Sequence, residues 1–99
     1  MKMKIPRSVN VLGHDYKIRL VAAAKLGAEH DGVCCYPERE IILNKECEKE
    51  LRWLAFLHEL RHAVQFESGL VQLLGQQSCE TDADQFASFI SSLQKQGIL

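Results

Sequence analysis

The chain has 99 residues and a mass of 11.2 kDa, so we expect one small domain over residues 1–99. The apolar and charged fractions, 46% and 25%, are ordinary for a globular protein and argue against disorder or a fibrous repeat. Twelve Lys and Arg residues against 13 Asp and Glu residues give a formal net charge of −1. This balance gives no electrostatic reason to expect nucleic acid or a membrane surface as a partner.

Secretion and membrane insertion are not predicted either. No apolar run approaches the roughly 20 residues of a membrane span, and the first residues lead into polar alternation, not into the apolar core of a signal peptide. These features predict a cytoplasmic protein with reduced thiols. Its four cysteines are Cys34, Cys35, Cys47 and Cys79.

The first 44 residues are predicted to form mostly β-structure. Apolar residues alternate with polar ones over residues 8–21, around a Gly-His-Asp turn, which predicts a β-hairpin. Residues 22–27 fit either a single helical turn or a connection. Residues 33–36 and 40–44 predict a second pair of short strands around a tight connection.

The rest of the chain is predicted to form two helices. From Lys45 the apolar period changes to 3.6, which indicates an amphipathic helix that ends at Gly69. Residues 70–77 are predicted to form a connection, and Ser78 to be the N-cap of a last helix that ends before Gly97. We therefore predict an α+β fold in which a small antiparallel sheet of three or four short strands packs on two helices.

The first helix carries the sequence His-Glu-Leu-Arg-His at residues 58–62, an H-E-x-x-H pattern. Histidines at positions i and i+4 stand one turn apart on the same side of a helix, so His58 and His62 are predicted to bind one Zn²⁺. Glu59, next to the first histidine, is predicted to accept a proton from a zinc-activated water. The pattern predicts a catalytic zinc site. The alternative interpretation is an amphipathic helix without a metal, in which two polar residues lie near the buried edge.

A catalytic zinc needs a third protein ligand, and no histidine follows residue 62. A carboxylate is therefore expected. Glu67 falls on the opposite side of a continuous helix, whereas Glu80 opens the last helix and has a side chain long enough to reach across. Asp82 and Asp84 stay as alternatives. Asp84 stands four residues after Glu80 and is also placed to accept a hydrogen bond from the outer nitrogen of a histidine ligand.

The motif at residues 58–62, followed by Glu-Thr-Asp-Ala-Asp-Gln-Phe-Ala at residues 80–87, resembles the gluzincin clan of zinc metallopeptidases. The small size and the upstream strands are similar to the minimal gluzincins and ImmA/IrrE-type metallopeptidase domains of bacteria, archaea and phages. The resemblance covers most of the chain in the order of its elements, and its two motifs are its specific part. It implies a zincin-like fold and an endopeptidase that hydrolyses peptide bonds of a protein or peptide substrate.

Carried over position by position, the resemblance implies the roles of five residues. His58, His62 and Glu80 would hold one zinc per chain. Glu59 would be the general base and acid, and Asp84 would orient His58. The clan also holds extended substrate on an edge strand beside the active-site helix, for which residues 33–36 and 40–44 are the two candidates. A transcriptional regulator is the substrate or partner that the ImmA/IrrE likeness implies.

The sequence departs from larger gluzincins at one point, because no His or Tyr follows the last helix motif to stabilise the oxyanion. Upstream candidates are Tyr36, His30, His14 and Arg39. This departure favours an alternative function, in which a zinc-stabilised zincin-like domain binds a protein partner without cleaving it. The intact Glu59, which a structural zinc site does not need, favours the enzyme.

Overall fold

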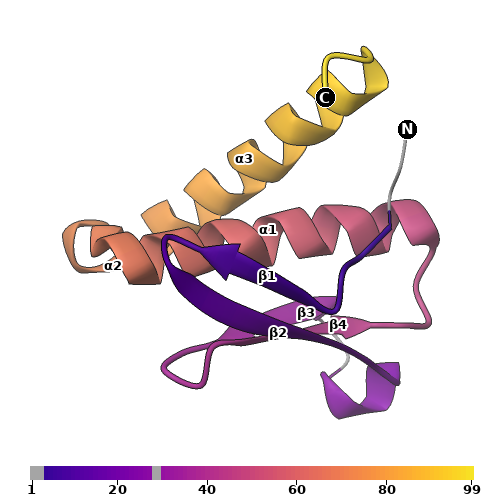
Figure 1. The fold of residues 1–99 in the computed structure, drawn as a ribbon, viewed down its shortest axis with the longest axis horizontal. Coiled ribbons are helices and arrows are strands. Elements are labelled where there is room, and N and C mark those ends of the chain that lie inside the picture. The colour runs from indigo at the N-terminus through magenta and orange to yellow at the C-terminus, as the bar shows by residue number, and fades with distance from the viewer. Residues whose placement is uncertain (1–3, 28–29) are drawn as a thin grey trace.

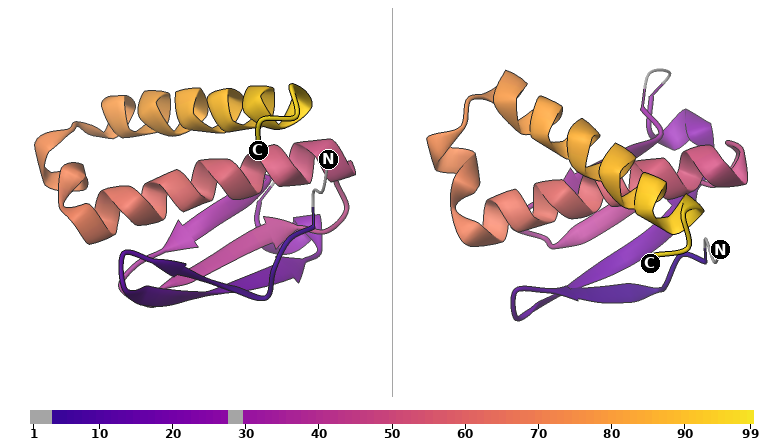
Figure 2. Two further views of the ribbon diagram at one scale, coloured as in Figure 1. Left: turned by 45° about the horizontal axis from the view of Figure 1, so that its top comes forward. Right: turned by 90° about the horizontal axis from the view of Figure 1, so that it is seen from above.

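The computed structural model describes residues 4–27 and 30–99. Residues 1–3, which begin the segment that the sequence predicts not to be a signal peptide, lie outside the described residues. The described residues form a sheet, a long helix on the sheet and a second long helix on the far side of the first (Figures 1 and 2). In chain order, the elements are β1 (Ser8–Val11), β2 (His14–Val21), the 3₁₀ helix η1 (Ala23–Lys25), β3 (Gly32–Cys35), β4 (Glu40–Asn44), α1 (Lys49–Ser68), α2 (Leu70–Leu73) and α3 (Gln76–Lys95). The predicted α+β class is confirmed.

The predicted hairpin is present. β1 and β2 pair in antiparallel fashion, with Val9 opposite Tyr16. The two residues between the strands, Leu12 and Gly13, have φ values of 51° and 92°. Positive φ at both central residues is the feature of a type I′ turn, whose twist matches that of the flanking strands.

The sheet is mixed, so the prediction of an antiparallel sheet is wrong at one pair of strands. The strand order is β1-β2-β4-β3, and β2 and β4 run parallel, with Ile18 opposite Ile41. The chain leaves β2, passes through η1, runs back as β3 and returns as β4, which inserts between β2 and β3 and therefore follows the direction of β2. As a result β3 lies at the edge of the sheet, and β4 is internal.

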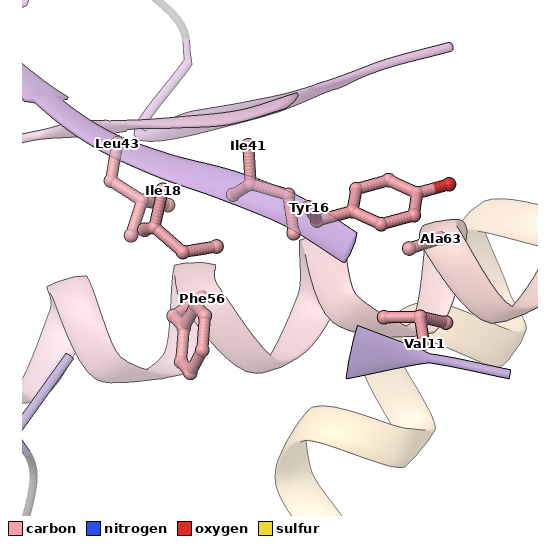
Figure 3. Close-up of a cluster of buried hydrophobic side chains, with 7 residues drawn as sticks. All are labelled: Val11, Tyr16, Ile18, Ile41, Leu43, Phe56 and Ala63. Atoms are coloured by element: carbon pink, nitrogen blue, oxygen red, sulfur yellow. The ribbon is translucent and has the colours of Figure 1, made fainter. Parts of the chain in front are cut away.

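The hydrophobic core lies between the sheet and α1 (Figure 3). Tyr16, Ile41 and Leu43 are completely buried, and α1 contributes Phe56 and Ala63 from its sheet-facing side. Burying a side chain of the size of Phe56 stabilises the fold by about 1.5–3 kcal/mol relative to leaving it exposed. This packing fixes α1, and with it the His-Glu-Leu-Arg-His motif, relative to the edge strand β3.

The predicted ends of the two long helices agree with the structure, and their predicted starts do not. The short helix α2 lies where only a connection was predicted. α1 begins at Lys49, four residues later than predicted, and ends as predicted at Gly69, whose φ of 83° is readily available only to glycine. The prediction of Ser78 as an N-cap is wrong, because α3 begins three residues earlier than predicted, with Gly75 as its cap. The Gly75 carbonyl accepts the first helical hydrogen bond, from the amide of Cys79. Glu80 therefore lies in the second turn of α3.

A partly buried ion pair connects the end of α1 to the sheet. Glu67 accepts hydrogen bonds from Arg39 Nε and from the Tyr16 hydroxyl, both at 2.7 Å, and its side chain is only 3% exposed. Arg39 stands in the turn between β3 and β4. The hydrogen bonds from Arg39 and then Tyr16 lower the pKa of Glu67 to about 2. Glu67 therefore faces the sheet, as expected for a residue on the side of α1 opposite His58.

We predict that this pair makes the fold sensitive to acid. A carboxyl group whose pKa is lower in the folded chain than the ordinary 4.5 stabilises the fold above pH 4.5 and loses that effect as the pH falls through about 2. Glu67→Gln should be less stable than the wild type at neutral pH, and the difference should shrink toward pH 2. Urea unfolding midpoints of both proteins across this range test it. A difference that is independent of pH would show that the Glu67 charge does not stabilise the fold.

Candidate metal centre

Two helices bring three potential metal ligands together. His58 and His62 lie one turn apart on α1, and Glu80 extends from α3, which packs on α1. The Nε2 atoms of the two histidines are 3.0 Å apart, and each is 3.1 Å from one oxygen of the Glu80 carboxylate. Among the described residues these side chains form a group whose ligand atoms all lie within 4.8 Å of one another. The three residues predicted as zinc ligands are therefore neighbours in the fold.

The outer nitrogen of each histidine also has a partner. His58 Nδ1 lies 2.8 Å from Oδ1 of Asp84, the residue predicted to orient it. His62 Nδ1 lies 2.8 Å from Oε1 of Gln65, which is 1% exposed and was not among the predicted site residues. A residue three positions after a helical histidine stands on the same face of the helix. That spacing is the signal by which the sequence could have indicated Gln65.

These outer contacts determine which ring nitrogens carry protons. His58 has a carboxylate at each ring nitrogen, Asp84 at 2.8 Å from Nδ1 and Glu80 at 3.1 Å from Nε2, and the shorter contact favours donation from Nδ1 to Asp84, which presents a lone pair at Nε2. The amide nitrogen of Gln65 donates to two oxygens of α3, so its oxygen faces His62, which likewise donates from Nδ1. Two imidazole lone pairs and a carboxylate then face one another, an arrangement that is repulsive unless a cation or proton lies among them. Two histidines and a glutamate are a known ligand set of catalytic zinc, so these residues fit that metal.

Glu59 lies beside this group without belonging to it. Its residue is 7% exposed, and its Oε2 is 4.0 Å from His58 Nε2. Burial raises the pKa of Glu59, while the neighbouring histidines act in the opposite direction. Gly32 on β3 packs against it, since a Cβ atom at this glycine would come within 3.2 Å of Glu59 Cγ. The carboxyl group is thus held between the edge strand and the histidines.

Pockets lie on both sides of the three ligands. One, of about 620 Å³, lies between β3, α1 and the start of α3 and is bordered at its far end by Phe66 and Val71. The second, of about 470 Å³, extends along α1 toward Leu51. Both pockets are lined by His58, Glu59 and Glu80, and by residues of the edge strand or the loop before it. Space for a ligand therefore exists on either side of the metal group and next to β3.

The four candidates for oxyanion stabilisation lie in different places. His30 lines both pockets. Tyr36 stacks on an aromatic ring of α1, with ring centroids 4.8 Å apart, and is not among the residues that line these two pockets. His14 and Arg39 lie at the other side of α1, beside Glu67. Of the four, the fold brings only His30 to the metal group within the described part of the chain.

Asp82, an alternative to Glu80 as the third ligand, has other contacts, and the nearby thiol of Cys34 is poorly suited to bind a metal. Asp82 accepts hydrogen bonds from Arg61 at 2.7 Å and from Gln65 at 2.9 Å, and the bond from Arg61 lowers its pKa. Cys34 lines the larger pocket, but burial raises the pKa of its thiol to about 12, which disfavours the thiolate that a metal requires. In the described structure none of the four cysteines forms a disulfide. The geometry therefore favours Glu80 as the third ligand.

Comparisons with known proteins found no match to this chain among protein-family models, curated proteins or solved structures. Among the described residues, no helix has the length and apolar character needed to cross a membrane.

Proposed function

We propose that this chain is a zinc-dependent metallopeptidase. The observation that carries the proposal is the proximity of three potential ligands, His58 Nε2, His62 Nε2 and the Glu80 carboxylate, within 4.8 Å of one another, while other groups contact the outer nitrogens of both rings. The donor set and the buried Glu59 beside it are the parts that metal-assisted peptide hydrolysis requires. The likeness to gluzincins in the two sequence motifs supports the same activity.

Zinc, when bound by His58, His62 and Glu80, supplies a Lewis acid that polarises the peptide carbonyl and lowers the pKa of a water molecule. Glu59 accepts a proton from the attacking water as its oxygen bonds to the carbonyl carbon. The same side chain then returns the proton to the amide nitrogen as the C–N bond breaks, which leaves a carboxylic acid and an amine. The acid then loses its proton to the amine. Asp84 and Gln65 hold the two rings in place throughout.

The surroundings of the site favour a polypeptide as the substrate. β3 is an edge strand whose residues Gly32 to Cys34 line the larger pocket, so its free backbone groups are available to pair with an extended chain. Pockets on both sides of the ligands give room for residues before and after the cleaved bond. Both features support an endopeptidase. The ImmA/IrrE likeness extends the proposal to a cytoplasmic transcriptional regulator as the substrate.

A second candidate function is a zinc-stabilised domain that binds a protein partner without cleaving it. One observation favours it: His14 and Arg39 are engaged beside Glu67, away from the pockets, and Tyr36 is stacked on Phe66 and does not line them. Such a domain would use the same edge strand and the same zinc ligands. The two functions differ in whether peptide bonds are broken.

Metal content and hydrolysis test the proposal together. We expect protein purified without added metal to hold about one zinc per chain, measured by elemental analysis. It should cleave an unfolded, fluorescently labelled protein, lose this activity in a chelator and regain it when zinc is restored. No zinc, even after zinc is offered at neutral pH, would contradict both functions. One zinc without hydrolysis would support the binding domain.

A further inference from the structure

Gln65 occupies a position between a metal ligand and the interface of the two helices. Its side chain is buried, and all three of its polar contacts are with protein atoms. Oε1 lies 2.8 Å from His62 Nδ1, while Nε2 lies 3.0 Å from the Cys79 carbonyl oxygen and 2.9 Å from Asp82 Oδ2. Gln65 therefore links α1, which carries two of the ligands, to the segment of α3 that carries the third.

The orientation of this amide is determined by its partners on α3. A carbonyl and a carboxylate are both acceptors, so the group facing them must be the NH₂ group of Gln65. The reverse orientation would set the Gln65 amide oxygen against two other oxygens and leave this buried oxygen without a donor, which is costly. The amide oxygen is thereby fixed toward His62, and it accepts the proton that His62 carries on Nδ1.

The other neutral tautomer of His62, protonated at Nε2, would interfere with metal binding. A neutral His62 that carried its proton on Nε2 would donate it to Glu80 Oε1, 3.1 Å away. That hydrogen bond would occupy both the imidazole nitrogen and the carboxylate oxygen that zinc needs. Without an acceptor at Nδ1, the metal-free site would be drawn toward this closed arrangement.

We propose that Gln65 is a positioning residue that holds His62 as the Nδ1-protonated tautomer and so keeps Nε2 free for the metal. It acts only through His62 and does not reach the reacting atoms. Asp82 completes the arrangement, because Arg61 holds its carboxylate at 2.7 Å and that carboxylate in turn holds the Gln65 amide. The contacts join α1 to α3 without any metal, so the ligands of both helices are positioned before zinc arrives.

The tautomer is measured directly in the metal-free wild-type chain. Long-range ¹H–¹⁵N NMR spectra, recorded at a pH at which both rings are neutral, should show His62 protonated at Nδ1. In Gln65→Met, which keeps the length of the side chain and removes the amide, His62 should shift toward Nε2 protonation. His58 is the internal control: the hydrogen bonds of Gln65 are with His62, Cys79 and Asp82, and the partners of His58 are unchanged, so its tautomer should not change.

Zinc affinity gives the second measurement, and it rests on the proposed function. Outer partners of metal-bound histidines typically contribute about 10–100-fold to metal affinity, so we expect Gln65→Met to raise the zinc dissociation constant by about that factor in a competition titration. Ser91→Ala is the matched control, because Ser91 is a buried polar residue of α3 further along the helix and should leave zinc affinity unchanged.

Two results would overturn the inference. One is a wild-type His62 that is protonated at Nε2. The NMR measurement that would show it needs neither a folded variant nor zinc. The other is a folded Gln65→Met protein with unchanged zinc affinity. Neither depends on hydrolysis. A wild-type chain that takes up no zinc would instead contradict the proposed function, while the tautomer of His62 would still decide the inference.

Discussion

Replacing Glu59 by glutamine is expected to abolish most of the hydrolysis while leaving zinc bound. The amide has the size of the carboxylate but does not take up a proton, and proton transfer by a positioned side chain contributes about 10²–10⁴-fold to such reactions. We therefore expect the rate on a labelled polypeptide to fall by at least a factor of about 100. Zinc should stay at one per chain, since Glu59 is outside the ligand group.

Glu48→Gln is the matched control for this substitution. It removes one carboxylate from the start of the same helix, and Glu48 precedes Glu59 by 11 residues, about 16 Å along the helix axis. Its rate and zinc content should match those of the wild type. If Glu59→Gln hydrolyses the substrate at a rate close to that of the wild type, Glu59 has no part in the reaction.

The features that could be predicted from the sequence depend on local patterns. The hairpin of β1 and β2 follows from a period of two and a tight turn, and the end of α1 from Gly69, because these signals involve neighbouring residues only. The helical pitch alone brings His58 and His62 to one side of a helix. The length of the Glu80 side chain predicts that it reaches them, and its two carboxylate oxygens lie 3.1 Å from the Nε2 atoms of the two histidines.

The features that could not be predicted depend on contacts between distant segments. Alternating apolar residues look the same in parallel and antiparallel strands, so the pairing of Ile18 with Ile41 leaves no trace in the local pattern. The bond from Tyr16 to Glu67 joins residues 51 positions apart. Gln65 is an intermediate case, since its spacing from His62 is local but its role depends on acceptors from α3.

Glu80→Ala is expected to weaken zinc binding more than Gln65→Met or Asp84→Asn does, because it removes a ligand. Four-ligand structural zinc sites have apparent binding free energies of about 10–16 kcal/mol, so one ligand accounts for about 3 kcal/mol, or roughly a hundredfold in affinity. The zinc dissociation constant should therefore rise by about two orders of magnitude. The fold should persist, because half of the Glu80 side chain is exposed and its contacts are with the two histidines. Competition titration measures the first effect, and thermal unfolding of the metal-free chain the second.

Asp84→Asn, one turn further along α3, separates the loss of a ligand from the loss of an orienting group. Asp84 lies at the outer nitrogen of His58, and an asparagine still offers an oxygen there, so its effect on zinc affinity should be clearly smaller than that of Glu80→Ala. An unchanged zinc content in Glu80→Ala would assign the third ligand to one of the alternatives, Asp82 or Asp84. A larger loss of zinc affinity in Asp84→Asn than in Glu80→Ala would identify Asp84 as the ligand, because a group that only orients His58 should contribute less than a ligand does.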